Sequence, residues 1–264
     1  MVRRARLDAE LVRRGLARSR EQAAELVHAG RVRVAGSTAT KPATAVDPAT
    51  PVLVEERPDE PDYASRGGHK LAGALDALPR LRVAGRRALD AGASTGGFTD
   101  VLLRRGAREV VAVDVGYGQL AWSLRTDPRV TVHDRSNVRE LTPETIGGAA
   151  ELTVADLSFI PLSLVLPALA ACTAPDGDLL PMVKPQFEVG RERVGAGGVV
   201  RDPAVRADAV LKVATAAYEL GLGTEAVVRS PLPGPAGNVE FFLWLRRGAP
   251  AADPAAIVRA VEAT

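Results

Sequence analysis

The stretch from Ala88 to Asp114 reads ALDAGASTGGFTDVLLRRGAREVVAVD. It holds a short apolar strand, a glycine-rich turn that opens a helix, a second apolar strand and an acidic residue at that strand's end. This order is typical of a nucleotide-binding unit in an open α/β sheet, where the helix amino terminus offers free N–H groups. Asp114 follows the first glycine by about twenty residues, where a carboxylate accepts hydrogen bonds from a ribose diol. The stretch therefore predicts a ligand that contains a ribose.

The turn favours S-adenosylmethionine (SAM) over a dinucleotide. A dinucleotide fingerprint is G-x-G-x-x-G, but the glycines here are Gly92, Gly96 and Gly97, and no Lys-Ser or Lys-Thr of a phosphate loop follows them. The order D-x-G-x-x-x-G-G suits SAM, which has a ribose, an amino-acid tail and a sulfonium but no pyrophosphate. A tight turn without a ligand is the alternative interpretation. The residues expected to contact SAM are Asp90, Gly92, Ser94, Thr95, Gly96, Phe98, Asp114 and Asn137.

Two residues near the end of that list have a second interpretation. Asn137 follows Ser136, and the pair is also typical of an Asx-type cap on a helical turn. Asp134 is a further candidate for a SAM contact. Both interpretations stay open at the level of sequence.

The length and composition of the chain limit the size and class of the protein. Its 264 residues fit two domains, or one large α/β domain with an extension. The single cysteine, Cys172, excludes an internal disulfide and a cysteine-rich metal site, and we expect no metal requirement. The longest apolar stretch, 157–172, is shorter than the ~18–20 residues of a membrane span. With no secretory signal visible, we expect a cytoplasmic protein that does not engage a membrane. The oligomeric state does not follow from the sequence.

The first forty-odd residues predict a small helical unit. Leu7, Leu11 and Leu16 start one amphipathic helix, and a second is capped at Ser19 and stopped by Gly30. Arg-Val-Arg-Val then alternates as a strand.

Charge is unevenly distributed along this part of the chain. Residues 1–41 carry a net charge of +6, and residues 42–62 carry −5. A compact basic unit built on a helix pair indicates a phosphate backbone as partner, although a solvated helical face explains the charge alone equally well.

Strands and helices alternate through the rest of the chain, which predicts a mostly parallel, doubly wound, Rossmann-like α/β sheet. We expect a small α+β RNA-binding domain over 1–60, a linker over 61–65 and the larger domain over 66–264. The expected strands are 87–91, 109–114, 130–133, 152–156, 179–184, 226–229 and 239–245, and the expected helices are 65–78, 97–105, 118–125 and 203–220.

Four charged residues fall where catalysis is expected. Asp156 and Lys184 end two strands, and ligands of open α/β sheets lie outside the carboxyl ends of the strands. Lys70 precedes the first strand of the larger domain, and Glu240 enters the last one. Only four of the 34 basic residues are lysine, and lysine, unlike arginine, can lose its proton when buried. Each residue also has a purely structural interpretation. Asp156 could cap a turn and Lys184 could form a surface salt bridge. Lys70 could be a solvated helix residue, and Glu240 could be a charge that protects a sheet edge from aggregation.

These residue types suit methyl transfer to a ribose hydroxyl. A 2′-OH is a weak acid, so it needs a base, or a partner for developing negative charge, held in line with the methyl donor. An amine flanked by a second amine and two carboxylates can supply both. General-base help of this kind contributes ~10²–10⁴-fold.

Two resemblances cover nearly the whole chain. Residues 5–55, through their Leu-Asp-x-x-Leu start and Gly-x-Val-x-Val end, resemble the S-four-type RNA-binding domain. From Ser65 to Leu245 the chain is similar to the TlyA family of ribosomal RNA 2′-O-methyltransferases, also known as hemolysins. The matching stretches are SRGGHKL, LDAGASTGGFTD, DVGYGQL, ADLSFI, MVKPQFE and GPAGNVEFFLWL.

The resemblance implies specific roles. In the wider FtsJ-like group, Lys70, Asp156, Lys184 and Glu240 match a catalytic tetrad centred on Lys184. SAM is the implied methyl donor, and a cytidine ribose in the RNA of both ribosomal subunits is the implied acceptor. The implied RNA contacts are Arg4, Arg6, Arg18, Arg20 and Lys41.

Two other function classes remain to be separated from this one. An RNA-binding protein with an inactive methyltransferase domain would lack methyl transfer, and a pore-forming hemolysin would need a membrane segment. The linker reads EPDYA, where a basic and aromatic segment is expected, so coupling between RNA and SAM binding is open here. Tyr63 is the aromatic residue available for that coupling.

Overall fold

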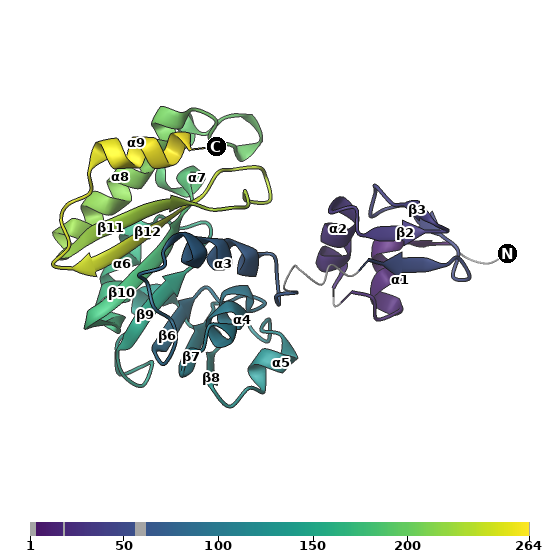
Figure 1. Ribbon diagram of the computed structural model, residues 1–264, viewed down its shortest axis with the longest axis horizontal. Helices are drawn as coiled ribbons and strands as arrows, with labels where there is room; N and C mark the ends of the chain where they lie inside the picture. The colour runs from purple at the N-terminus through teal and green to yellow at the C-terminus, as the bar shows by residue number, and fades with distance from the viewer. Residues whose placement is uncertain (1–3, 18, 56–61, 264) are drawn as a thin grey trace. The chain divides into compact units, whose positions relative to one another are not determined.

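The computed structural model describes residues 4–17, 19–55 and 62–263. The chain divides into two units, residues 1–62 and 63–264, and each is described by itself. Figure 1 shows a helix-flanked sheet in the second unit and a smaller mixture of helices and short strands in the first. Tyr63 and Ser65, expected in a linker, belong to the second unit, because Tyr63 is buried and packs on the first turn of its first helix.

The first unit is a small α+β domain built around one apolar cluster. Its two helices contribute Leu7, Leu11, Ala23 and Val27 to that cluster. The elements are β1 (Ala5–Arg6), α1 (Leu7–Arg13), α2 (Arg20–His28), β2 (Val32–Val34), β3 (Ser37–Thr38), β4 (Ala45–Val46) and β5 (Val52–Val54). β1 pairs with β4, and β3, β2 and β5 form a second antiparallel sheet.

The predicted helix boundaries in this unit are largely confirmed. The backbone N–H of Gln22 donates to Ser19 Oγ at 3.1 Å, so Ser19 caps α2 as expected. Gly30 ends α2 at φ +69°, a left-handed conformation that glycine adopts at no steric cost. Leu16 was expected in the first amphipathic helix, and this prediction was wrong. Helix α1 ends before Gly15, whose φ is +70°, and Leu16 is exposed.

The second unit contains a seven-stranded sheet with the order β11-β12-β10-β9-β6-β7-β8. All neighbouring strands run parallel except β12, which is antiparallel to both β10 and β11. This confirms the doubly wound α/β prediction. The strands are β6 (Arg87–Ala91), β7 (Glu109–Val113), β8 (Val130–His133), β9 (Ala150–Ala155), β10 (Thr173–Val183), β11 (Leu222–Arg229) and β12 (Phe241–Arg247).

Helices cover both faces of this sheet (Figure 1). One face packs against α3 (Gly67–Ala77), α4 (Gly97–Arg104) and α5 (Trp122–Arg125). The other packs against α6 (Leu166–Cys172), α8 (Pro203–Glu219) and α9 (Pro254–Glu262). Strand β12 shows why both faces are filled: its side chains alternate between the two apolar clusters, as the two-residue period of a strand requires.

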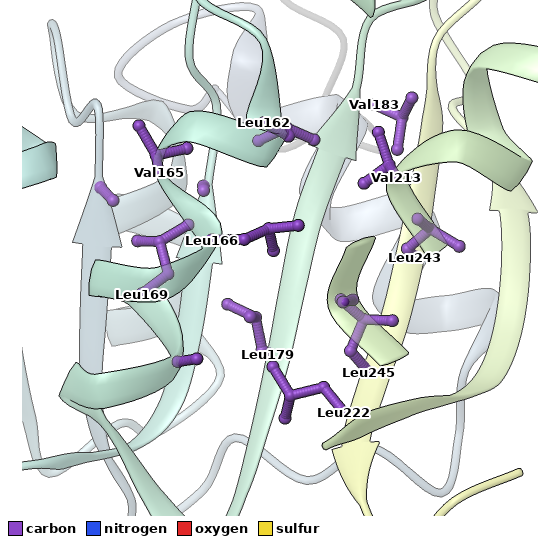
Figure 2. Close-up of a cluster of buried hydrophobic side chains, with 14 of the residues drawn as sticks. Leu162, Val165, Leu166, Leu169, Leu179, Val183, Val213, Leu222, Leu243 and Leu245 are labelled. Atoms are coloured by element: carbon purple, nitrogen blue, oxygen red, sulfur yellow. The ribbon is translucent and has the colours of Figure 1, made fainter. Parts of the chain in front are cut away.

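The larger apolar cluster lies on the side of α6 and α8 (Figure 2). Leucines of α6 and of the preceding turn, η2 (Leu162–Leu164), pack toward Leu179 of β10 and Leu243 of β12. The packing orders the chain just after β9, where Asp156 lies. The buried Cys172 belongs to this cluster, and burial raises the pKa of its thiol to about 11. It is a structural thiol, as predicted.

Helix α5 starts later than expected, and helices α6 and α9 were not predicted. Helix α5 begins at Trp122 and not near Gly118, because Gly118 has a φ of +65°. Helix α6 lies within the apolar stretch 157–172, and its Pro167 occupies the first turn, a position that tolerates proline.

Candidate functional site

The ends of four strands meet at one edge of the sheet. Ala91 of β6 pairs with Ala155 of β9, and Ala155 pairs with Pro181 of β10. Val183 of β10 pairs with Phe241, the first residue of β12. Because β12 runs antiparallel, its beginning lies beside the ends of the others. The register therefore gathers the glycine turn after β6, Asp156, Lys184 and Glu240 along this edge.

The edge contains a topological switch point. From β6 the chain continues to β7 and β8 on one side, whereas β9 lies on the other side of β6. Ligands of open α/β sheets bind where the strand order reverses in this way, outside the carboxyl ends of the strands. Gly92 and Asp156 are the first residues after the two strands that flank this point.

Lys184 and Asp156 form an ion pair at this edge. Lys184 Nζ lies 2.6 Å from Asp156 Oδ1 and donates to Ser158 Oγ at 2.9 Å. The side chains are 10% and 23% exposed, so the pair is partly open to solvent. An ion-pair partner and a hydrogen-bond acceptor, both from the segment after β9, thus position the amine that directly follows β10.

Lys70 and Glu240 form a second, more deeply buried ion pair. Lys70 Nζ donates to Glu240 Oε2 at 2.5 Å, and the two side chains are 7% and 1% exposed. Gly234 packs closely on the carboxylate, because a Cβ on this glycine would lie 2.6 Å from Glu240 Oε1. The pair joins α3 to the start of β12.

The first turn of α3 connects the two pairs. A Cβ on Gly67 would lie 3.8 Å from Asp156 Oδ2, so this helix start contacts the first pair. Lys70 lies on the same helix three residues later, close to one helical turn. The structure therefore brings the four predicted catalytic residues to one place.

The glycines of the turn serve close packing within the protein. A Cβ on Gly92 would lie 2.6 Å from the Asp156 carbonyl oxygen, and one on Gly96 would lie 2.3 Å from Leu124 Cδ1. A Cβ on Gly97 would lie 2.7 Å from the backbone nitrogen of Gly68. The neighbours that would exclude a side chain at these three positions belong to the protein itself.

Asp114 is held beside the turn by backbone hydrogen bonds. Its Oδ2 accepts from the Ser94 N–H at 2.8 Å, and its Oδ1 accepts from the Gly116 N–H at 2.7 Å. Ser94 has a φ of +48°, and both Ser94 and Thr95 are exposed. Each carboxylate oxygen keeps acceptor capacity, so Asp114 is oriented and able to accept bonds from a diol.

Two other predicted SAM contacts are covered by protein. Phe98 is 3% exposed and packs against Phe242 with ring centroids 6.0 Å apart. Asp90 is 0% exposed, and its Oδ2 accepts from Thr99 Oγ1 at 2.7 Å. Both side chains are therefore buried within the protein.

Asn137 and Asp134 also have protein partners. The Asn137 side chain accepts from the Arg139 N–H at 3.1 Å and caps the turn η1 (Val138–Glu140), which is the alternative interpretation of this residue. Asp134 pairs with Arg125 at 2.9 Å, and this hydrogen bond lowers its pKa.

The burial of Asp90 predicts a specific pH dependence of stability. Burial raises the pKa of its carboxyl to about 7, with the hydrogen bond from Thr99 opposing the shift. The folded state therefore holds this proton where the unfolded state has lost it, so stability falls as pH rises from about 4 to about 7. Replacing Asp90 with asparagine should remove that fall, up to about 4 kcal/mol at 1.36 kcal/mol per pKa unit.

Urea unfolding of the wild type and Asp90→Asn at pH 5, 6, 7 and 8 measures this effect. The difference between the two unfolding free energies should grow with pH and level off near pH 8. Parallel pH profiles for the two proteins would show that the carboxyl does not titrate in this range.

Sequence analysis missed three residues next to the tetrad. Ser158 binds the Lys184 amine, and Phe159, the next residue, is 90% exposed at a φ of +64°. Glu188 is buried, and its Oε1 accepts from the Leu162 N–H at 2.8 Å, which ties the segment after β9 to α7 (Pro185–Glu188). Burial raises the pKa of Glu188. The stretch ADLSFI carried a signal for the first two, since it places a hydroxyl and an aromatic ring directly after a catalytic strand end.

The predicted RNA contacts have different surroundings. Arg6 and Arg20 both pair with Asp8, and Arg4 and Lys41 are exposed. Arg18 lies outside the described residues.

The described residues contain neither a cluster of metal ligands nor a helix that could span a membrane. No three His, Cys, Asp or Glu side chains there are arranged to hold a metal ion. No helix in the described ranges has the length and apolar character to cross a bilayer.

Comparison with known proteins gives two family matches. The FtsJ-like methyltransferase family matches residues 63–247, and the S4 domain matches residues 5–52. A Mycobacterium tuberculosis protein named 16S/23S rRNA (cytidine-2′-O)-methyltransferase TlyA is 65% identical over 246 residues, which cover 93% of this chain and 91% of that protein.

Two further similarities extend over the same length. The Bacillus subtilis protein YqxC, described as an rRNA methyltransferase, is 44% identical over 91% of this chain and 85% of its own. A solved structure of a Streptococcus thermophilus protein, described as a hemolysin, superimposes with a TM-score of 0.78 at 38% identity, covering 99% of this chain and 95% of that one.

Proposed function

This chain belongs to the FtsJ-like methyltransferase family, in its TlyA group, and from that premise we propose that it methylates the 2′-OH of cytidine in ribosomal RNA, with SAM as donor. The observation that carries the proposal is the meeting of two lysine–carboxylate pairs beside the glycine turn at the switch point of the sheet. A ribose hydroxyl needs a base and a partner for developing charge, and these pairs supply both kinds of group.

Lys184 is the central amine of the proposed mechanism. Asp156 and Ser158 hold its nitrogen from one side, so its position is set before the RNA arrives. As a neutral amine it would accept the proton of the 2′-OH while the oxygen bonds to the methyl carbon and the methyl–sulfur bond of the donor breaks, which leaves S-adenosylhomocysteine. Lys70, held by Glu240, provides a fixed positive charge that stabilises the developing alkoxide.

The residues around the turn fit SAM as the donor. SAM supplies an electrophilic methyl group. Asp114 offers oriented carboxylate oxygens to a ribose diol, and the exposed Ser94 and Thr95 provide hydroxyls beside it.

Ribosomal RNA is the proposed partner, with the S4 domain as its docking unit. Exposed Arg4, Arg6, Arg20 and Lys41 lie on that domain. The M. tuberculosis relative is named for both 16S and 23S RNA, and the similarity covers nearly all of this chain, so we propose that both subunits are substrates. Because its proposed substrate is ribosomal RNA, we propose a cytoplasmic location for the enzyme. We propose that no metal takes part, because the tetrad itself supplies the base and the fixed charge.

Methyl transfer from labelled SAM to purified small and large ribosomal subunits tests the proposal. The label should enter both subunits as 2′-O-methylcytidine. A protein that binds the subunits and SAM without transferring label would instead be an RNA-binding protein with an inactive methyltransferase domain.

We propose that Phe159 contacts the target base. It is exposed, lies one residue from Ser158 and packs against Phe187 with ring centroids 5.2 Å apart. An aromatic ring that stacks on a base contributes ~1–3 kcal/mol, so Phe159→Ala should raise the KM for ribosomal subunits about tenfold or more. The affinity for SAM should not change. An unaltered KM would show that the ring does not meet the RNA.

A further inference from the structure

Two arginines of the first unit converge on one buried carboxylate. Arg6 donates from Nε to Asp8 Oδ1 at 3.1 Å and from Nη2 to Asp8 Oδ2 at 2.8 Å. Arg20 Nη2 donates to the same Oδ2 at 3.0 Å. Asp8 is 4% exposed, whereas the arginine side chains are 53% and 59% exposed. The carboxylate therefore lies beneath two guanidinium groups that are open to solvent.

Asp8 is itself firmly anchored. Its backbone N–H donates to the Pro42 carbonyl at 2.9 Å, and its Oδ1 accepts from the Ala9 N–H at 2.7 Å. The hydrogen bond from Arg6 is the main cause that lowers the pKa of Asp8 to about 2, so the group stays ionised at neutral pH. Pro42 directly follows Lys41, which places a third cation on the segment that binds Asp8.

The arrangement prepares both arginines to bind an anion. Within the described contacts, Arg6 gives two of its five N–H donors to Asp8 and keeps three, and Arg20 gives one and keeps four. A guanidinium held in place loses less conformational freedom when it binds, and its planar fork matches the oxygens of a phosphate. Helix stability does not explain Arg20, because it opens α2, where the helix dipole disfavours a cation.

We propose that Asp8 is a positioning residue of the RNA-binding surface, holding Arg6 and Arg20 as a rigid pair for RNA phosphates. The inference rests on the proposed function, which supplies the RNA. It has an unusual consequence: removing this negative charge from a basic surface weakens the binding of a polyanion. If net charge alone governed docking, the same change would strengthen it.

The chain offers a matched control for this test. Glu10 lies on the same helix, is 1% exposed, and is also held by two arginines, Arg13 and Arg14, which lower its pKa to about 2. Arg14, however, is turned inward, and its Nη1 donates to the Thr50 carbonyl at 2.8 Å. Asp8→Asn and Glu10→Gln therefore change the net charge equally but release different arginines.

Binding of the full-length protein to purified ribosomal subunits distinguishes positioning of the arginines by Asp8 from docking that net charge alone governs. Asp8→Asn should weaken binding about five- to tenfold, the cost of ordering two long side chains at the moment of binding. Glu10→Gln should leave it unchanged or slightly tighter. Equal tightening by both variants would overturn the inference, because charge alone would then explain docking.

A second measurement excludes a purely structural role for Asp8. In an Arg6→Ala/Arg20→Ala background, Asp8→Asn should cause no further loss of binding, since no pair remains to be positioned. A further loss as large as in the wild type would overturn the inference. A wild-type protein that fails to bind subunits would refute the proposed function, whereas a normal wild type with a fully active Asp8→Asn variant would refute the inference alone.

Discussion

Replacing Lys184 with alanine is expected to lower the rate of methyl transfer by about 10²–10⁴-fold, the usual contribution of a general base. SAM affinity should stay within a few-fold of wild type, because Asp114 and the turn after β6 do not involve this amine. Single-turnover transfer of labelled methyl to ribosomal subunits, together with calorimetric titration of SAM, measures both quantities.

Two further substitutions sharpen this prediction. Lys184→Arg keeps a positive charge but cannot give up its proton at useful pH, so it should be as inactive as the alanine variant. Lys212→Ala is the matched control, since the Lys212 amine donates to the Glu188 carbonyl and not to the tetrad, and it should stay near wild-type activity. An active Lys184→Arg enzyme would show that charge, and not proton acceptance, is the role of Lys184.

Lys70→Ala is expected to cost both stability and activity. It would leave the Glu240 carboxylate, 1% exposed, without its cation, and breaking a buried pair in this way costs about 3–5 kcal/mol. Activity should fall as well, because the fixed charge beside the developing alkoxide is lost. The partly exposed Lys184–Asp156 pair should contribute much less to stability. Urea unfolding and the transfer assay measure the two effects.

A double variant separates the structural role of this pair from its chemical one. Replacing both partners, as Lys70→Met with Glu240→Leu, removes the unpaired charge, and such replacements are often neutral or stabilising. The double variant should regain the free energy of unfolding and stay inactive. Recovery of activity together with stability would show that the pair only supports the fold.

The sequence predicted those parts of the site that depend on local order along the chain. Asp156 and Lys184 directly follow apolar strands, so their meeting at one edge of a parallel sheet follows from the fold class. The Lys70–Glu240 contact spans 170 residues and exists because β12 runs antiparallel. The run FFLWL is apolar at every position, so its pattern shows neither direction nor register. Only the family resemblance, which assigns Lys70 and Glu240 to one tetrad, implied that these two residues lie close together.

The burial and the pairing of several site residues depend on tertiary packing, so they could not be predicted from the sequence. Phe98 and Asp90 lie in a motif typical of ligand binding, yet the neighbouring elements bury both side chains. The exposure of Phe159 depends on a left-handed backbone conformation that its residue type does not suggest. Charge counting treated Arg6 and Arg20 as free cations, but both are paired to Asp8 once α1 and α2 pack together.

The central claim is that this protein passes a methyl group to the sugar oxygen of a cytidine with the help of the Lys184 amine. The most direct test is nucleoside analysis of ribosomal RNA after incubation of subunits with labelled SAM and either the wild type or Lys184→Ala. The account predicts label in 2′-O-methylcytidine with the wild type and almost none with the variant. Label on a base, or equal labelling by the two proteins, would contradict it.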